Sequence, residues 1–375
     1  MNIPFNKPYL SGLETEYIKD AVASGKISGD GIYTNKCHQF FRQRYHFAQP
    51  LLTTSCTDAL EMAAILCDIQ PNDEVIAPSY TFVSTVNAFV LRGARIVFSD
   101  SEEDTPNMDV STVESLVTDK TKAIVPVHYA GIACDMDFLL SVARKHELFV
   151  VEDAAQAIDS YYKGDPLGSI GDFGAFSFHE TKNVISGEGG MLVVNDVKFS
   201  NRAEIIREKG TNRSAFFRGE VDKYDWVDIG SSFLPSEIVA AFLYAQLENL
   251  DSIQSRRKSI WRRYYRGLKH LEEKGYINLP VIPDYATNNG HMFYIVCENI
   301  EVRSKLINHL KKNNILAVFH YVLLHSSPYY SNRHDGRPLQ NAQRYSDCLL
   351  RLPLYFNLTE SEQDFIIESV IQYYG

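Results

Sequence analysis

Seven short apolar runs alternate with segments of helical period between residues 50 and 195, and this alternation constrains the fold more than any other feature. Apolar strands separated by helices are typical of a parallel sheet covered by helices on both faces. We expect the strands at Leu51–Thr54, Glu74–Ala77, Arg95–Ser99, Ala123–His128, Leu148–Glu152, Ala175–Phe178 and Met191–Val194. Apolar residues three or four positions apart predict helices at Thr57–Cys67, Phe82–Arg92, Val110–Val117 and Met136–His146. The pattern predicts an α/β core of about seven strands.

The segments on either side of this core predict a second, smaller domain. Two helical patterns, Pro235–Leu250 and Ser252–Lys274, are separated only by Asp251, which can act as an N-cap. We also expect a helix at Leu10–Ser24, a glycine-rich turn at 25–31, a mobile loop at 210–232, strands at 291–299 and 315–320, and helices at Val302–Asn313 and Glu360–Tyr373. The prediction is an N-terminal arm and large domain over residues 1–250, and a small α+β domain over residues 251–375.

Composition narrows the classes of function. The formal net charge of −10 argues against a general nucleic-acid binder, which needs basic surface to displace phosphate counterions. The N-terminus has no apolar signal-peptide core, and no run approaches the roughly 18 apolar residues of a membrane span. We therefore expect a cytoplasmic protein with no membrane partner. The cysteines form no Cys-x-x-Cys pair or zinc-ligand cluster, so we expect free thiols and no metal site at Cys37, Cys56, Cys67, Cys134, Cys297 and Cys348.

The segment Thr54–Leu60 is the first candidate for chemistry, because an apolar strand there ends in small polar residues and a helix begins at once. Backbone N–H groups at a helix start can hold a phosphate group. A simple N-cap, formed by one of the hydroxyl side chains, is the structural alternative.

Two adjacent carboxylates, Glu152 and Asp153, follow a very apolar strand. Ligands of open α/β sheets lie outside the carboxyl ends of such strands. Asp153 is well placed to pair with the protonated ring nitrogen of pyridoxal phosphate, and Gln156 to donate a hydrogen bond to the ring hydroxyl. The alternative is that one of the two carboxylates caps the following turn.

Lys182 follows another strand and is flanked by glycines, so it can approach a bound ring. Loss of hydration favours the neutral amine, which is nucleophilic toward a carbonyl. The hydroxyl of Ser177 can reach a phosphate, and Phe82 can stack on a ring, although such aromatics are usually core residues. A single lysine carries little weight. A phosphate loop, an aromatic, Asp-x-x-Gln and Ser-x-x-x-x-Lys in this order form the set that a pyridoxal-phosphate site requires.

Other patterns are weaker. His320 and Tyr321 follow a predicted strand and are candidate substrate contacts, as is His325, but a buried, hydrogen-bonded histidine is the alternative. The segment Gly29–Gly31 lacks the third glycine and the preceding strand of a dinucleotide fingerprint, which ranks a nicotinamide dehydrogenase last.

The chain resembles the DegT/DnrJ/EryC/StrS family of sugar-nucleotide aminotransferases, which have the aspartate-aminotransferase fold, fold type I of the pyridoxal-phosphate enzymes. The resemblance spans nearly the whole chain through Ser79–Thr85, Phe149–Gln156, Phe176–Asn183, Arg207–Ser214 and Asp228–Ser232. It implies a Schiff base at Lys182. It also implies ring contacts from Asp153, Gln156 and Phe82, and phosphate contacts from the Ser177 hydroxyl and the Thr57 and Asp58 backbone.

The resemblance further implies a homodimer with shared active sites. Ser231 and Ser232 stand where many members carry an asparagine that reaches the partner's site. The implied reaction moves an amino group from L-glutamate to dTDP-4-keto-6-deoxyglucose for cell-surface polysaccharides such as enterobacterial common antigen or O-antigen. The galacto 4-amino product is favoured and the gluco product is the alternative. A dehydratase is disfavoured because relatives of that kind replace the lysine with histidine, and a non-catalytic homologue remains open.

Overall fold

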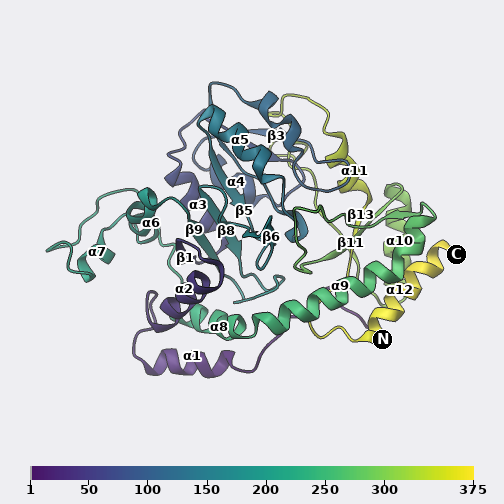
Figure 1. Cartoon of the computed structure of the whole chain (residues 1–375), viewed down its shortest axis with the longest axis horizontal. Coiled ribbons are helices and arrows are strands. Elements are labelled where there is room, and N and C mark those ends of the chain that lie inside the picture. The colour runs from purple at the N-terminus through teal and green to yellow at the C-terminus, as the bar shows by residue number, and fades with distance from the viewer. Residues whose placement is uncertain (1) are drawn as a thin grey trace.

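The computed structural model of the chain describes residues 2–375, and a seven-stranded sheet forms the centre of this part of the chain (Figure 1). In spatial order its strands are β1 (Gln49–Thr53), β9 (Gly190–Val194), β8 (Phe173–Ser177), β5 (Phe149–Asp153), β4 (Thr121–Ile124), β2 (Glu74–Pro78) and β3 (Arg95–Ser99). β9 pairs antiparallel with β1 and β8, and the other pairs are parallel. The mostly parallel α/β sheet is therefore confirmed, and each predicted strand overlaps an observed one.

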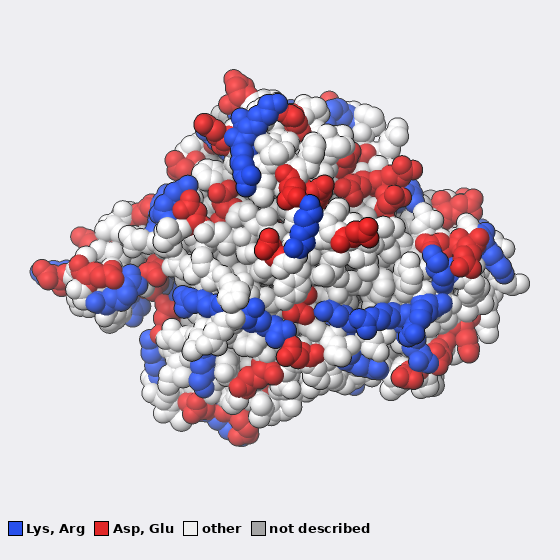
Figure 2. All heavy atoms as spheres, in the orientation of Figure 1, with Lys and Arg blue, Asp and Glu red and all other residues white. Residues whose placement is uncertain are grey.

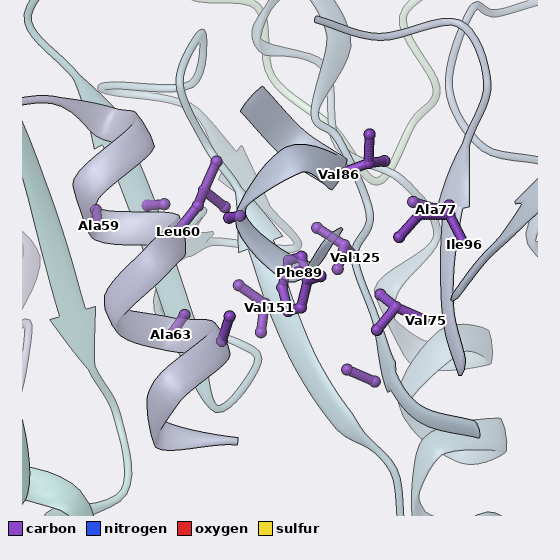
Figure 3. Close-up of a cluster of buried hydrophobic side chains, with 14 of the residues drawn as sticks. Ala59, Leu60, Ala63, Val75, Ala77, Val86, Phe89, Ile96, Val125 and Val151 are labelled. Carbon is purple, nitrogen blue, oxygen red and sulfur yellow. The ribbon is translucent and has the colours of Figure 1, made fainter. Parts of the chain in front are cut away.

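Helices cover both faces of this sheet because successive strand residues point to opposite sides. Leu51 belongs to one buried cluster and Leu52 to the other. The first face packs against α3 (Cys56–Leu66), α4 (Ser84–Val90) and α6 (Ser200–Arg207), as Figure 3 shows for α3 and α4. The second packs against α2 (Ile32–Tyr45), η1 (Val110–Leu116), α5 (Met136–His146) and α8 (Glu237–Glu248), with α1 (Glu14–Ala23) lying on α8. This core fixes the positions of the strand ends.

A smaller antiparallel sheet lies in the C-terminal part of the chain. Its order is β10 (Ile277–Asn278), β11 (Phe293–Cys297), β13 (Leu349–Leu352) and β12 (Val318–Phe319). Around it lie α9 (Leu250–Glu273), α10 (Ile300–Lys312), α11 (Gln340–Cys348) and α12 (Glu360–Tyr374). The N-terminal segment joins this unit, since Ile3 N–H donates to Asn314 O at 2.9 Å and Leu316 N–H to Ile3 O at 3.0 Å. The division at residue 250 stays a prediction.

The remaining elements are short. They are η2 (Tyr129–Gly131), β6 (Tyr161–Tyr162), β7 (Asp165–Pro166), η3 (Val197–Phe199) and α7 (Arg213–Phe217). Figure 1 shows that α6 and α7 lie at the left end of the molecule, where the chain through α7 extends away from the central sheet.

Several local predictions need correction. Asp251 is not an N-cap, because α8 and α9 meet at Asn249; Asp251 instead lies in the first turn of α9, where it accepts a hydrogen bond from Arg44 at 2.6 Å. The helix predicted at Val110–Val117 is a 3₁₀ helix, and the predicted loop at 210–232 contains α7. α2, α6, α11 and β13 were not predicted.

Both signs of charge occur on the face seen in Figure 2, with Lys and Arg gathered in a band over α8 and α9 and most of the acidic groups above it. Within residues 2–375, no helix combines the length and the apolar character that crossing a membrane requires. All six cysteines are free, as expected.

Candidate active site

A cavity of about 410 Å³ lies at the carboxyl ends of the central strands. The ends of β5 and β8 and the start of α3 contribute to its wall, and so do four residues of the C-terminal part of the chain, His291, His320, Tyr321 and Arg351. Ligand sites are typically about 300–1,000 Å³ and lie outside such strand ends in α/β proteins. The topology of the sheet therefore produces a binding cavity where the sequence predicted one.

Lys182 lines this cavity from the hairpin that joins β8 to β9. The hairpin is held by hydrogen bonds from Phe178 N–H to Gly189 O at 2.8 Å and from Glu180 N–H to Gly187 O at 3.0 Å. The Lys182 N–H donates to His179 O at 2.9 Å, so the lysine lies in a defined turn. Burial lowers the pKa of the Lys182 amine below its usual value. A larger fraction of this amine is consequently neutral and nucleophilic at neutral pH.

Glu152 and Asp153 are adjacent but have different surroundings, because consecutive strand residues face opposite sides. Asp153 lines the cavity, and its carboxylate accepts hydrogen bonds from Thr85 Oγ1 at 2.7 Å and Ala155 N–H at 3.1 Å. The fully buried Glu152 carboxylate accepts three backbone N–H groups of the 168–171 turn at 2.7–2.8 Å and faces His128 Nε2 at 2.9 Å. Glu152 therefore stabilises a turn, while Asp153 presents a carboxylate to the cavity.

The start of α3 brings backbone N–H groups to the same cavity. Ser55 is the N-cap, and its hydroxyl accepts a hydrogen bond from Asp58 N–H at 3.0 Å. Cys56 and Thr57 line the cavity, and the first N–H groups of a helix have no acceptor within the helix. Gly190 of β9 packs so closely here that a Cβ atom would overlap the backbone of Ser55 and Cys56. The close approach of strand and loop explains why this position requires glycine.

The wall of the cavity is completed by one amide, one imidazole and two aromatic side chains, those of Gln156, His320, Tyr321 and Phe82. Gln156 Oε1 accepts from the N–H of Ala130 at 2.6 Å, and its Nε2 donates to the Tyr321 hydroxyl at 3.1 Å. His320 Nδ1 lies 2.8 Å from a tyrosine hydroxyl, and burial lowers the pKa of His320 well below its usual value. Phe82 is 56% exposed, so its ring is accessible for stacking.

Eight of the predicted residues line one cavity: Thr57, Phe82, Asp153, Gln156, Ser177, Lys182, His320 and Tyr321. Four others do not: Asp58, Ser231, Ser232 and His325, whose Nδ1 lies 2.7 Å from the Ser79 hydroxyl. The carboxylate of Asp58 is hydrogen-bonded to the Thr54 hydroxyl, and the Asp58 N–H is taken by the Ser55 cap. Ser231 and Ser232 lie in the segment that extends beyond α6; Ser231 pairs with residues 206 and 209, and Ser232 forms a bridge to residue 208.

Among the lining residues that the sequence analysis did not predict are Cys56, His291 and Arg351. Arg351 had a usable signal, because a charged residue interrupts the apolar run Leu349–Leu354. His291 had none, since its place depends on a hydrogen bond at 2.9 Å that its Nδ1 donates to Asn183 Oδ1, and Asn183 lies far away in sequence.

Comparison with known proteins agrees with this geometry. The sequence matches the DegT/DnrJ/EryC1/StrS aminotransferase family over residues 8–371. The chain belongs to this family.

Several relatives are similar over nearly their whole length. GDP-perosamine synthase of Escherichia coli O157:H7 is 33% identical, with 100% of this chain and 99% of the relative covered. Spore coat polysaccharide biosynthesis protein SpsC of Bacillus subtilis is 34% identical, with 98% and 96% covered. The sugar aminotransferase Spr1654 of Streptococcus pneumoniae, solved in its PMP form, superimposes with a TM-score of 0.91 at 29% identity, covering 99% of each chain. The same protein has also been solved in a PLP form.

The chain is thus a pyridoxal-phosphate-dependent sugar aminotransferase of fold type I, as the sequence predicted. Its substrates are a sugar nucleotide and an amino donor. The cavity suits the cofactor chemically, because it combines an amine with a lowered pKa, a carboxylate at a strand end and the N-terminus of a helix. Pyridoxal phosphate withdraws electrons from the reacting carbon when bound.

Proposed function

We propose that Lys182 is the catalytic lysine and that the other cavity residues hold pyridoxal phosphate. Asp153 pairs with the ring nitrogen, Gln156 contacts the ring hydroxyl and Phe82 stacks on the ring. The Ser177 hydroxyl and the N–H groups at the start of α3 bind the phosphate. The placement of Lys182, Asp153 and Gln156 around one cavity supports these roles, and it is the observation that carries the proposal.

Lys182 Nζ has a second role in the proposal, the movement of a proton during each half-reaction. The lowered pKa of its amine favours the neutral form, which can accept a proton from the reacting carbon and return it. The Asp153 carboxylate lies opposite the ring nitrogen, held in place by the two hydrogen bonds from Thr85 and Ala155. Phe82 and Tyr321, whose ring centroids are 6.2 Å apart, form the aromatic wall of the cavity.

The proposed reaction moves an amino group from L-glutamate to dTDP-4-keto-6-deoxyglucose. The product is dTDP-4-amino-4,6-dideoxygalactose, and the 4-amino-4,6-dideoxyglucose epimer is the alternative. The family resemblance of the sequence implies this substrate, and the polysaccharide role named for SpsC supports use in cell-surface polymers. The name GDP-perosamine synthase makes a GDP-linked keto sugar the competing substrate. His320 and Tyr321 are proposed sugar contacts on the cavity wall.

A homodimer is the proposed assembly, with Ser231 and Ser232 of one subunit reaching the active site of the other. In support, the chain through α7, which leads to these two serines, extends from the body of the molecule in Figure 1. It also exposes large apolar side chains, including Phe217 at 69% and Trp226 at 80%. Exposed apolar groups of this size are typical of a surface that a second chain covers.

The test is to incubate the purified holoenzyme with L-glutamate and either dTDP-4-keto-6-deoxyglucose or its GDP-linked counterpart. We expect amination of the dTDP sugar, and proton couplings at C4 that assign the galacto product. Gluco couplings would establish the alternative stereochemistry, and faster amination of the GDP sugar would refute the proposed nucleotide. Lys182→Ala serves as the control, because it removes the proposed catalytic amine.

The non-catalytic alternative is tested in the same preparation. A working site is expected to change the absorbance of its bound cofactor when L-glutamate is added. If no amino acid changes the absorbance of the bound cofactor, the result favours a non-catalytic homologue.

A further inference from the structure

Arg351 lies on β13 and places a guanidinium in the wall of the cavity that holds Lys182. Its Nε is buried and has no hydrogen-bond partner among residues 2–375. Apart from burial, which lowers the pKa of Arg351, the groups that influence this pKa are the tyrosines Tyr129, Tyr321 and Tyr80. A buried cation without an anion is unfavourable, because hydration is lost without compensation. The protein therefore keeps a costly charge at its reaction site.

A second buried arginine, Arg257, has a structural role and serves for comparison. Arg257 donates from Nε to Gly290 O at 3.1 Å and from Nη2 to His291 O at 2.7 Å. Backbone carbonyls thus satisfy Arg257, and it does not line the cavity. The Nε of Arg351 has no such acceptor. Other arginines also have a buried Nε without a partner among residues 2–375, but none of them lines this cavity, which indicates that Arg351 is suited to a ligand rather than to the fold.

The N-terminal segment backs the Arg351 side chain. Phe5 lies under the guanidinium, with its ring centroid 4.6 Å from the central carbon. The segment is anchored on one side of Phe5 by the backbone hydrogen bonds of Ile3 and on the other by Asn6 Nδ2, which donates to Glu180 O at 3.2 Å. Stacking covers one face of the planar group and leaves its N–H edge for in-plane hydrogen bonds.

We propose that Arg351 binds the α-carboxylate of the amino-acid donor. This inference rests on the proposed transamination and names the group that recognises its first substrate. A guanidinium matches a carboxylate with two parallel hydrogen bonds. The α-carboxylate is bonded directly to the carbon that reacts near Lys182, so both fit within one cavity. The diphosphate of a 4-keto sugar nucleotide is attached at C1, across the pyranose ring from the reacting C4, and lies farther from the lysine.

The two half-reactions separate this role from a structural one. Each can be followed by the absorbance of the bound cofactor, with L-glutamate in one direction and dTDP-4-keto-6-deoxyglucose in the other. Arg351→Met is expected to lower kcat/KM for L-glutamate roughly 10- to 100-fold, the effect of losing a charge-assisted carboxylate contact. The keto-sugar half-reaction is expected to fall less than about 3-fold, because that substrate has no carboxylate at its reacting carbon.

A second donor makes the test specific for the α-carboxylate. 4-Aminobutyrate is L-glutamate without that group, so its rate is expected to be nearly the same with and without Arg351. The preference of the enzyme for L-glutamate over 4-aminobutyrate should therefore shrink roughly 10- to 100-fold in Arg351→Met, since the two deletions remove the same contact. Arg351→Lys keeps the positive charge but not the two parallel N–H donors. Its preference for L-glutamate over 4-aminobutyrate should lie between those of the wild type and Arg351→Met.

Arg257→Lys is the structural control and should affect both half-reactions and both donors alike. Equal loss with both donors in Arg351→Met would overturn the inference, as would a loss confined to the keto sugar, which would assign the arginine to the sugar nucleotide. If the wild type reacts with L-glutamate and Arg351→Met is unchanged, the inference alone fails. If the wild type does not react with L-glutamate, the proposed donor fails and the inference with it.

Discussion

Replacing Glu152 by glutamine is expected to destabilise the fold, whereas replacing its neighbour Asp153 by asparagine is expected to stop catalysis. The Glu152 carboxylate is fully buried. One oxygen accepts two N–H groups of the 168–171 turn, both at 2.7 Å, and the other accepts a third at 2.8 Å and faces His128 at 2.9 Å. Asp153 accepts two hydrogen bonds, one of them from a hydroxyl that can reorient toward an amide.

The magnitude follows from these contacts. Glutamine keeps one oxygen but places an NH₂ group against the N–H of Gly168. Losing a charge-assisted hydrogen bond costs about 1.5–3 kcal/mol, and leaving a buried donor unsatisfied costs about 1–3 kcal/mol, so the total is roughly 3–6 kcal/mol. An unfolding entropy of about 2.1 cal/mol/K per residue over 375 residues converts this to a fall in Tm of about 4–8 °C. Asp153→Asn is expected to change the free energy of unfolding by about 1 kcal/mol.

The assay is thermal unfolding of both variants, together with turnover per bound cofactor. Glu152→Gln should unfold earlier, with turnover within about 10-fold of the wild type at low temperature. Asp153→Asn should keep its Tm within about 2 °C and lose turnover by about 10²-fold or more, the usual scale for removing an electrostatic contact at the reacting group. Equal Tm changes in the two variants, or an unchanged Tm in Glu152→Gln, would refute a structural role for Glu152 and a catalytic role for Asp153.

Three further predictions concern other parts of the site and the core. Gly190→Ala should weaken cofactor binding and destabilise the fold by about 1–3 kcal/mol, because its Cβ overlaps the Ser55 backbone; cofactor titration and Tm check this. Phe82→Ala should weaken cofactor binding about 2- to 10-fold with little change in Tm, because the ring is 56% exposed; equal cofactor affinity would contradict stacking. Burial lowers the pKa of His38 to about 3, and its Nε2 accepts from Leu52 N–H. The folded protein holds the His38 ring in its neutral form, whereas the ring of the unfolded chain takes up a proton below pH 6.5. The free energy of unfolding therefore decreases as the pH falls from 6.5 toward 3, by roughly 2–3 kcal/mol at pH 4.5. His38→Gln should flatten this dependence of Tm on pH, and an unchanged slope would contradict it.

The central strands could be predicted because burial on both faces makes them continuous apolar runs, as in Phe149–Asp153. The direction of β9 could not, since the same apolar run serves a parallel or an antiparallel neighbour. α2 was missed although Tyr33, Cys37 and Phe41 recur at helical spacing on its buried side. The glycines at 25–31 predicted only a turn, and α2 begins directly after Gly31, its N-cap.

The residues of the site were predictable where they follow strands, because strand ends meet at one edge of the sheet. Lys182, Asp153 and Gln156 are of this kind. Arg351 was missed although it interrupts an apolar run, because its place in the cavity depends on a small antiparallel sheet whose strand β13 has only four residues. Asp58 was expected to offer a backbone N–H to the phosphate, but the local competition of the Ser55 cap for that N–H is visible only in the structure.

The most direct test of the account is reduction of the holoenzyme with borohydride, which fixes the cofactor to the amine that holds it. Digestion and mass spectrometry are expected to recover the pyridoxyl label on the peptide containing Lys182, and Lys182→Ala should lose it. Recovery of the label on another lysine, or its persistence in Lys182→Ala, would contradict the assignment of Lys182 as the catalytic residue.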